Sequence, residues 1–239
     1  MIIQGIDNMK NRYEIIIFDF DDTLFDYERT EKKALCESFK IHDLLYKEEY
    51  YEIFKTINRT MWEIQGNDHL TTSHFKIKRF ERFFEKISVK ISPEIFSNTY
   101  TECSENGDLI DGVEEVINKL FKDIILIAAS NGPCTPRIEK LSNSAIAGKL
   151  IFYSSESFVE GYSKPNPQFF YSILEDFKVS SPDKVLVVGD KLATDILCAN
   201  RAGFRSVLFK FREHNEDKSI ANHDFTINDF RELLEIVYK

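Results

Sequence analysis

A short apolar segment near the start of the chain runs directly into a cluster of acids. Ile15–Phe18 is a β-prone apolar run, and Asp19, Asp21 and Asp22 follow it at once. Like charges this close repel, and burying them is costly unless a cation or a shared proton compensates. Mg²⁺ is the simplest compensation, because it prefers carboxylate oxygens together with phosphate. The pattern therefore predicts a buried strand that delivers an acidic, metal-binding site to the carboxyl edge of a sheet, where open α/β folds bind ligands.

Short β-prone runs alternate with helix-length amphipathic stretches through most of the remaining chain. Because strands that alternate with helices form βαβ units, this order predicts an α/β fold with a parallel sheet covered by helices on both faces. After the first run, further strands are expected at Ile124–Ala129, Leu150–Tyr153, Val185–Val188 and Ser206–Phe209. The helices between the later strands are expected at Val113–Phe121, Pro136–Ala145, Gln168–Phe177 and Asp195–Ala202.

Residues 26–106 interrupt this alternation with helical periodicity. Apolar residues such as Phe80 recur there at the spacing of one helix face. A basic run that includes Arg79 is expected to be a solvated face. We therefore expect an insert of about four helices at 26–106, between two parts of an α/β core at 1–25 and 107–239.

The charge and composition of the 239 residues exclude several kinds of partner. A formal net charge of −9 provides no field that would attract a nucleic-acid polymer, although a small anionic metabolite could bind beside local cations. No apolar run approaches the roughly 20 residues that a membrane-spanning helix needs, so no membrane partner is expected. The four cysteines lack CxxC spacing and are expected to be buried free thiols of a cytoplasmic protein. No feature indicates the oligomeric state.

Two loops after the first strand carry groups that could bind an anion. Ser130 and Asn131 follow the strand expected at Ile124–Ala129, and their turn could direct the Ser130 hydroxyl and backbone N–H groups at an anion. Taken alone, Ser-Asn-Gly is also an ordinary turn. Lys164 lies in a proline-stiffened loop before a helix, where its ammonium could neutralise both the acids and a phosphoryl oxygen. A solvated lysine is the alternative there.

Another strand also ends in acid. Gly189 and Asp190 follow Val185–Val188, and the glycine would let the backbone turn tightly and expose that carboxylate. Asp195 could be a first-turn acid that interacts with the helix dipole, or it could belong to the same site. Because the carboxyl ends of parallel strands meet at one edge of a sheet, these groups are expected to gather with Asp19 around one small anion.

Taken in order, the residues resemble the motifs of a known family, the haloacid dehalogenase-like hydrolases. The matching residues are Asp19-Phe-Asp21-Asp-Thr23, then Ser130, then Lys164, and finally Gly189-Asp190 with Asp195. The resemblance implies a Rossmann-like core, and a helical insert directly after the first motif is similar to the family's C1 cap, which is expected to close over the site and read the leaving group. The segment from Asn58 to Trp62 is similar to the noncanonical-nucleotide 5′-nucleotidase branch. Trp62 could stack a nucleobase, although such aromatic residues more often form helix-bundle core.

The chemistry expected of this family is covalent transfer of a phosphoryl group. Asp19 would attack phosphorus and form an aspartyl-phosphate, which divides a very slow hydrolysis into two easier steps. Asp21 would protonate the leaving oxygen and later deprotonate the attacking water. Since two acids with opposite tasks need different environments, one is expected to be held ionised by the metal and the other to be able to carry a proton.

The resemblance also implies a Mg²⁺ site and its support. The ligands would be the Asp19 carboxylate, the Asp21 main-chain carbonyl and Asp190. Asp195 would orient Lys164 or a metal-bound water.

The remaining motif residues would bind phosphate or hold the loop. Ser130, Asn131 and Lys164 are the expected phosphate-binding residues. Asp22 is expected to structure the turn through an Asx-type bond, and Thr23 to brace the same loop.

The favoured function is therefore a Mg²⁺-dependent phosphomonoester hydrolase whose partner is a small phosphorylated metabolite, expected to be a nucleoside 5′-monophosphate. The same motifs could serve a sugar-phosphate or phosphoglycolate phosphatase, or a phosphomutase. Hydrolytic dehalogenation is disfavoured, because it needs neither a metal nor an acid at Asp21. A receiver-like signalling domain is a different alternative. An insert as long as 26–106 argues against it, and so does a general base that would shorten the life of the phosphoryl group.

Overall fold

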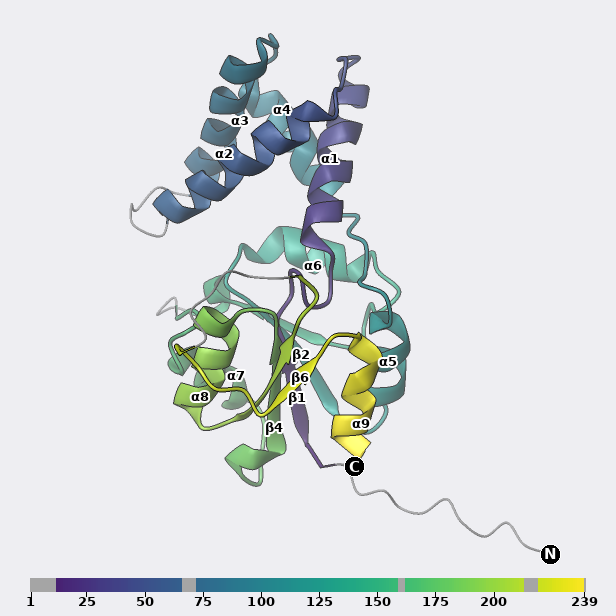
Figure 1. Ribbon diagram of the computed structural model, residues 1–239, viewed down its shortest axis with the longest axis vertical. Helices are drawn as coiled ribbons and strands as arrows, with labels where there is room; N and C mark the ends of the chain where they lie inside the picture. The colour runs from purple at the N-terminus through teal and green to yellow at the C-terminus, as the bar shows by residue number, and fades with distance from the viewer. Residues whose placement is uncertain (1–11, 66–71, 159–161, 213–218, 239) are drawn as a thin grey trace, which may run out of the picture. The chain divides into compact units, whose positions relative to one another are not determined.

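The computed structural model of the chain describes residues 12–65, 72–158, 162–212 and 219–238. The chain divides into two compact units, one made of Met1–Asp26 with Asp108–Lys239 and the other of Tyr27–Gly107. The first is an α/β unit with a six-stranded parallel sheet, and the described part of the second is all helical (Figure 1). The expected fold class, a parallel α/β core with a helical insert, is confirmed.

The sheet has the strand order β3-β2-β1-β4-β5-β6, and every pair of neighbours is parallel. The strands are β1 Ile15–Phe18, β2 Ile125–Ser130, β3 Ile151–Ser154, β4 Val185–Gly189, β5 Arg205–Phe209 and β6 Phe225–Ile227. Phe18 of β1 pairs with Ala128 on one side and with Val188 on the other. The residues that follow these three strands therefore emerge at the same level of one sheet edge.

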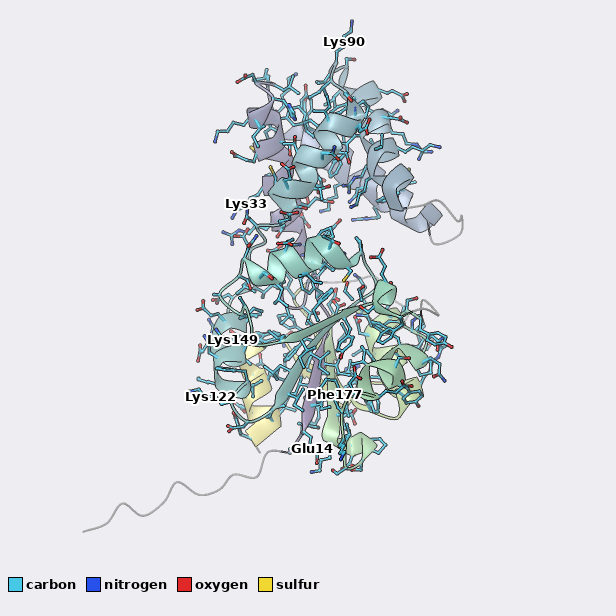
Figure 2. All side chains as sticks on the ribbon, turned by 180° about the vertical axis from the view of Figure 1, so that it is seen from behind. Glu14, Lys33, Lys90, Lys122, Lys149 and Phe177 are labelled. Atoms are coloured by element: carbon cyan, nitrogen blue, oxygen red, sulfur yellow. The ribbon has the colours of Figure 1, made fainter. Side chains whose placement is uncertain are left out.

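Alternate residues of the central strand point into two separate hydrophobic cores, as the pleat of a strand requires. Ile16 and Phe18 pack in one core and Ile15 and Ile17 in the other. Side chains of α5 Val113–Leu120, α6 Cys134–Ser142 and α9 Leu233–Tyr238 cover the first core. Side chains of α7 Gln168–Leu174 and α8 Leu197–Ala202 cover the second. Figure 1 shows α5 and α9 on one side of the strands and α7 and α8 on the other, and Figure 2 shows the same layers from behind, with their side chains.

The helical unit is built on aromatic side chains. Its helices are α1 Tyr27–Ile41, α2 Glu49–Gln65, α3 Thr72–Ile87 and α4 Pro93–Ser104. Phe39, Phe54, Phe80 and Phe96 are fully buried and contact one another at ring-centroid distances of 5.1 to 5.3 Å. The helical periodicity of this region therefore reflects a bundle core, as expected. Arg79 differs from the expectation of a solvated face, because only 6% of it is exposed.

Several elements differ from those expected. The segment expected as one helix from Asp195 to Ala202 is a π-helical turn, Leu192–Ile196, that leads into α8. Strand β6 and helix α9 were not expected, and both are short. Single 3₁₀ turns lie at Ser155–Ser157, Pro182–Lys184 and Phe230–Glu232.

All four cysteines are free, but the expectation that they are buried holds only for Cys198, since Cys36 is exposed and the other two are partly exposed. Within the described ranges, every helix is too short or too polar to span a bilayer. The side chain of Trp62 lies outside the described part of the chain.

Candidate active site

The acidic loop after β1 is a tight turn held by its own backbone. The Asp19 N–H donates to the Val188 carbonyl of β4 at 2.8 Å, which extends the sheet pairing by one residue. The Phe20 carbonyl then accepts two N–H groups of the loop at 3.0 Å, and the Asp22 N–H donates to the Phe25 carbonyl at 2.7 Å. Asp22 has a φ of 60°, a left-handed conformation that acids tolerate better than most residues. The turn thus fixes Asp19 and Asp21 at the carboxyl edge of the central strand.

Lys164 lies at the centre of this edge. Its ammonium is 2.5 Å from Asp19 Oδ1, 2.6 Å from Asp195 Oδ1 and 3.0 Å from the Ala129 carbonyl. These three acceptors match the three donors of an ammonium group. Burial alone would lower the pKa of Lys164, but the charges of Asp19 and Asp195 outweigh it and raise the pKa. Lys164 is therefore a fixed cation, and the alternative of a solvated lysine does not apply.

Asp195 reaches this lysine from the π-helical turn, a distortion that often occurs at functional sites. Its Oδ2 accepts the Lys191 N–H at 3.1 Å, which leaves Oδ1 for Lys164. A Cβ on Gly189 would lie 2.4 Å from the Cβ of Asp195, so only glycine fits at that position. Gly189 is thus required by the close approach of Asp195, rather than by the tight turn that was expected.

Asp190 completes a group of three acids. Asp19, Asp190 and Asp195 each offer a carboxylate oxygen, and these oxygens all lie within 4.8 Å of one another. Asp190 and Asp195 are almost fully buried. Burial, together with the neighbouring charge of Asp195 and against the opposing charge of Lys164, raises the pKa of Asp19 to about 7. Negative charge is therefore in excess at this edge, and the donors are hard oxygens of the kind that Mg²⁺ binds.

Asp21 lies in a different electrostatic environment. Arg137 donates from a guanidinium NH₂ to Asp21 Oδ2, and the Lys140 ammonium is 3.6 Å from Oδ1. Burial would raise the pKa of Asp21, but these two cations outweigh it and lower the pKa. In the structure Asp21 is thus the acid held ionised and Asp19 the one with the raised pKa. The two acids thus lie in different environments, and the task expected of each stays a prediction.

Ser130 is the last residue of β2, and Asn131 follows it at the same edge. Ser130 is buried, and its hydroxyl accepts the Gly132 N–H at 3.1 Å, as in an ordinary turn. The Asn131 side chain makes two hydrogen bonds of 2.8 Å to the backbone of Lys164, donating to its carbonyl and accepting from its N–H. Asn131 therefore fastens the loop that carries the lysine. The phosphate contacts expected of both residues stay predictions.

Asp22 and Thr23 hold the loop in unequal ways. Asp22 Oδ1 accepts from Arg212 Nε at 3.3 Å, and the same guanidinium pairs with Asp26, the last residue before α1. Asp22 therefore structures the turn through an ion pair to the segment after β5. Thr23 is fully buried, and its hydroxyl has no hydrogen-bond partner among the described residues, so it supports the loop by packing.

Four basic residues of this region were not singled out from the sequence: Arg137, Lys140, Lys191 and Arg212. Two of them could have been noticed, since Arg137 and Lys140 lie three residues apart on the helix that follows the Ser130 loop and so share one helix face. Arg212 could also have been noticed, because it follows β5 at the same edge of the sheet.

Comparisons with known proteins agree with this architecture. A family model described as haloacid dehalogenase-like hydrolase matches residues 13–203. The HAD-hydrolase YfnB of Bacillus subtilis is 27% identical over 195 residues, 80% of this chain and 82% of that protein. The pyrimidine 5′-nucleotidase PynA of Streptococcus pneumoniae is 23% identical, covering 95% of this chain and 96% of that protein. A glyceraldehyde 3-phosphate phosphatase of Pyrococcus furiosus is 24% identical, covering 95% of this chain and 93% of that protein.

A solved structure of YfnB, bound to magnesium, has the same fold. It superimposes with a TM-score of 0.82 at 24% identity and covers 94% of this chain and 98% of that one. The stretch matched by the family model runs from β1 to the end of α8 and includes all three acids of the cluster around Lys164. The chain therefore belongs to the haloacid dehalogenase-like hydrolases.

Proposed function

We propose that this hydrolase is a Mg²⁺-dependent phosphomonoesterase that works through an aspartyl-phosphate at Asp19, with nucleoside 5′-monophosphates as its substrates. The observation that carries the proposal is the position of the Lys164 ammonium, 2.5 Å from Asp19 and 2.6 Å from Asp195. A buried cation fixed beside a carboxylate suits transfer of an anionic group, because it stabilises charge without reorganising during the reaction.

Asp19 is the proposed nucleophile, and Asp21 the acid and base. A carboxylate oxygen of Asp19 forms a bond to phosphorus while the ester bond breaks, and the leaving oxygen takes a proton from Asp21. Water then attacks the phosphorus of the aspartyl-phosphate and passes a proton to Asp21. The bond between phosphorus and the Asp19 oxygen breaks, which releases phosphate and restores the Asp19 carboxylate. The contacts of Asp21 with Arg137 and Lys140 favour its ionised form, the form that this second step needs.

The residues at the edge of the sheet fit a divalent cation. Carboxylates are in excess, and they are hard oxygen donors within 4.8 Å of one another. We propose that Asp19 and Asp190 supply carboxylate ligands and Asp21 its main-chain carbonyl, while Asp195 is occupied with Lys164 and the Lys191 N–H. When bound, Mg²⁺ would offset the repulsion between the acids and polarise the phosphoryl oxygens.

The phosphoryl oxygens are assigned to two groups of this chain. Lys164 supplies a fixed positive charge, and Ser130 supplies a hydroxyl at the end of the neighbouring strand β2. Asn131 supports both, since its side chain ties the Ser130 loop to the backbone of Lys164.

The choice of nucleotides rests on the relatives. PynA, a pyrimidine 5′-nucleotidase, covers almost the whole chain, which favours a nucleoside 5′-monophosphate. The glyceraldehyde 3-phosphate phosphatase covers it equally well at similar identity, so a sugar-phosphate substrate is the second candidate. We favour the nucleotide because the Asn58 to Trp62 segment of this chain also resembles the nucleotidase branch.

A panel of phosphomonoesters, assayed for free phosphate with Mg²⁺ and with EDTA, tests the proposal. We expect metal-dependent release, fastest from nucleoside 5′-monophosphates, and its loss in Asp19→Asn. Asp176→Asn, which changes an exposed acid of the same unit, is the matched control and should keep full activity.

Lack of metal-dependent release from every ester would contradict the proposal, and so would an Asp19→Asn variant as active as the wild type. Transfer of phosphate to a second sugar hydroxyl would indicate a mutase, and a long-lived phospho-aspartate would indicate a receiver-like protein.

A further inference from the structure

The carboxylate of Asp21 is held from one side by helix α6. Arg137 bonds to Oδ2, while Lys140 lies 3.6 Å from Oδ1. The two cations are three residues apart, so they project from the same face of the helix. Both oxygens of this carboxylate therefore face a positive charge.

The surroundings of the two cations are shaped to hold them in place. Arg137 Cζ lies 5.9 Å from the centre of the Phe20 ring, and the Lys140 ammonium lies 5.8 Å from the same ring and 5.7 Å from that of Phe25. Such cation–π contacts fix a cation against an aromatic face. Phe20 stands between Asp19 and Asp21 in the chain, so the same loop positions the acids and the cations.

Gly132 leaves the space that the guanidinium occupies. A Cβ at Gly132 would lie 2.0 Å from Arg137 Nη1 and 2.2 Å from Cζ, which no side chain could accommodate without moving the arginine. Gly132 directly follows the loop of Ser130 and Asn131. Glycine at this position therefore leaves room beside the loop for the Arg137 guanidinium.

The attachment of α6 does not explain this arrangement. Leu141 of this helix is buried in the core against the sheet and anchors the helix there. A packing helix has no need of two cations aimed at a carboxylate beside the nucleophile. Their common target indicates a role in what Asp21 does.

We propose that Arg137, supported by Lys140, is a positioning residue that directs the Asp21 carboxyl group toward the leaving oxygen of the substrate. The inference rests on the proposed function, since it concerns the acid of that reaction. The Asp21 side chain can rotate about two torsions, and an ion pair to a rigid, planar guanidinium restricts it to one orientation. A general acid contributes only when it is within hydrogen-bond reach of the atom it protonates.

A comparison of leaving groups tests this role. An alkoxide needs a proton as it leaves, whereas p-nitrophenolate is stable enough to leave without one. The ratio kcat/KM reports only the steps up to release of the leaving group, so the later attack of water does not affect it. We expect Arg137→Gln to lower kcat/KM at least about tenfold for the alkyl phosphomonoester cleaved best by the wild type, as loss of part of a general-acid contribution would. For p-nitrophenyl phosphate we expect a much smaller decrease.

A double-mutant cycle tests whether Arg137 acts through Asp21. In an Asp21→Asn background, Arg137→Gln should cause no further loss of kcat/KM for the alkyl ester, because the group that it positions can no longer donate a proton. Arg137→Lys should recover part of the loss, because it keeps the charge but not the planar fork. It also serves as the test variant should Arg137→Gln fail to fold. The matched control is Glu139→Gln, at an exposed position of the same helix, which should leave kcat/KM unchanged for both substrates.

Equal losses for the two substrates, or additive losses in the Asp21→Asn background, would overturn the inference. These outcomes differ from failure of the proposed function, which would appear as an Asp19→Asn variant that keeps metal-dependent activity toward both esters. A loss of kcat/KM for the alkyl ester alone, together with a non-additive double-mutant cycle, would support both the positioning role of Arg137 and the proposed function.

Discussion

The α/β unit and the helical unit each bury a charged network, and the two networks differ in how their charges balance. Around Lys164, at the edge where the parallel strands end, carboxylates are in excess. In the helical unit one acid, Glu31, is joined to one cation, Arg79, through the amide of Asn58. Apart from Asp19, which is partly exposed, both networks consist of nearly fully buried polar side chains, so burial alone does not distinguish a site from a structural feature.

The network of the helical unit pairs one acid with one cation. Asn58 donates to Glu31 at 2.5 Å and accepts from Arg79 at 3.1 Å, and the Tyr51 hydroxyl donates to the second oxygen of Glu31 at 3.2 Å. The Arg79 guanidinium also lies 4.7 Å from the centre of the Tyr100 ring. Opposite charges are equal in number and enclosed by aromatic side chains. Such a network can specify how the helices pack.

The network around Lys164 is unbalanced. Burial, together with the neighbouring charge of Asp195, raises the pKa of Asp19 to about 7, and a further cation would lower the repulsion between the acids. Strongly shifted groups of this kind cluster at functional sites. The comparison teaches that excess charge, rather than buried charge, indicates chemistry in this protein.

The largest effect is expected for Lys164→Met. Removing the ammonium leaves Asp19 and Asp195 buried without their partner, which should destabilise the fold by about 3–5 kcal/mol. Activity should fall by at least about 10²-fold, because the fixed charge on the transferred group is lost. Denaturant unfolding and phosphate release measure the two effects. Lys149→Met, a surface lysine that donates to the Ala145 carbonyl, is the matched control. A fully stable and active Lys164→Met variant would show that the comparison is wrong.

Arg79→Met should have a large effect on stability alone. Loss of the cation leaves Glu31 buried and unbalanced, with an expected cost of about 3–5 kcal/mol in denaturant unfolding. Adding Glu31→Gln to this variant should restore much of the lost stability, since the remaining groups of the network are then neutral. Arg82→Met, an exposed position on the same helix, should change little. A folded Arg79→Met variant that binds substrate normally but loses turnover would show that the network of the helical unit also takes part in catalysis, which would contradict the comparison.

The smallest effect is a pH dependence of stability that Glu31 contributes. Burial, against the opposing charge of Arg79, raises the pKa of Glu31 above its ordinary value of 4.5, so the folded chain holds this proton more tightly than the unfolded chain. The resulting stability is fully present below the ordinary pKa and is lost as the pH rises through the raised pKa. Relative to Glu31→Gln, the wild type should thus lose unfolding free energy as the pH rises above 4.5. The loss should be about 1.4 kcal/mol for each tenfold difference in proton affinity between the folded and the unfolded chain. Parallel pH profiles for the two proteins would contradict this.

The sequence predicted the strand-end part of the site well, because parallel strands bring their carboxyl ends together by construction. Asp19, Asp190 and Lys164 could be placed at one edge from the order of the strands alone. The sequence did not reveal what Arg137 contacts, since that depends on how α6 packs against the loop after β1.

Other differences have similar physical causes. The strand β6 is three residues long and lacks a continuous apolar run, so local pattern could not identify it. The π-helical turn carries Asp195, whose contacts with Lys164 and the Lys191 N–H the local pattern does not reveal. The basic run around Arg79 is typical of a surface, and only the aromatic side chains around this arginine, together with Asn58, make its burial tolerable. Tertiary contacts decided each of these features.

The most direct test of the central claim is to look for phosphate on Asp19 during turnover. The wild type, mixed with substrate and Mg²⁺ and quenched in acid, would be digested and its peptides examined by mass spectrometry, with EDTA and Asp19→Asn as controls. The account predicts a phosphoryl group on the peptide that contains Asp19, absent from both controls. Phosphate on another residue, or rapid turnover with no phosphorylated peptide at any quench time, would contradict it.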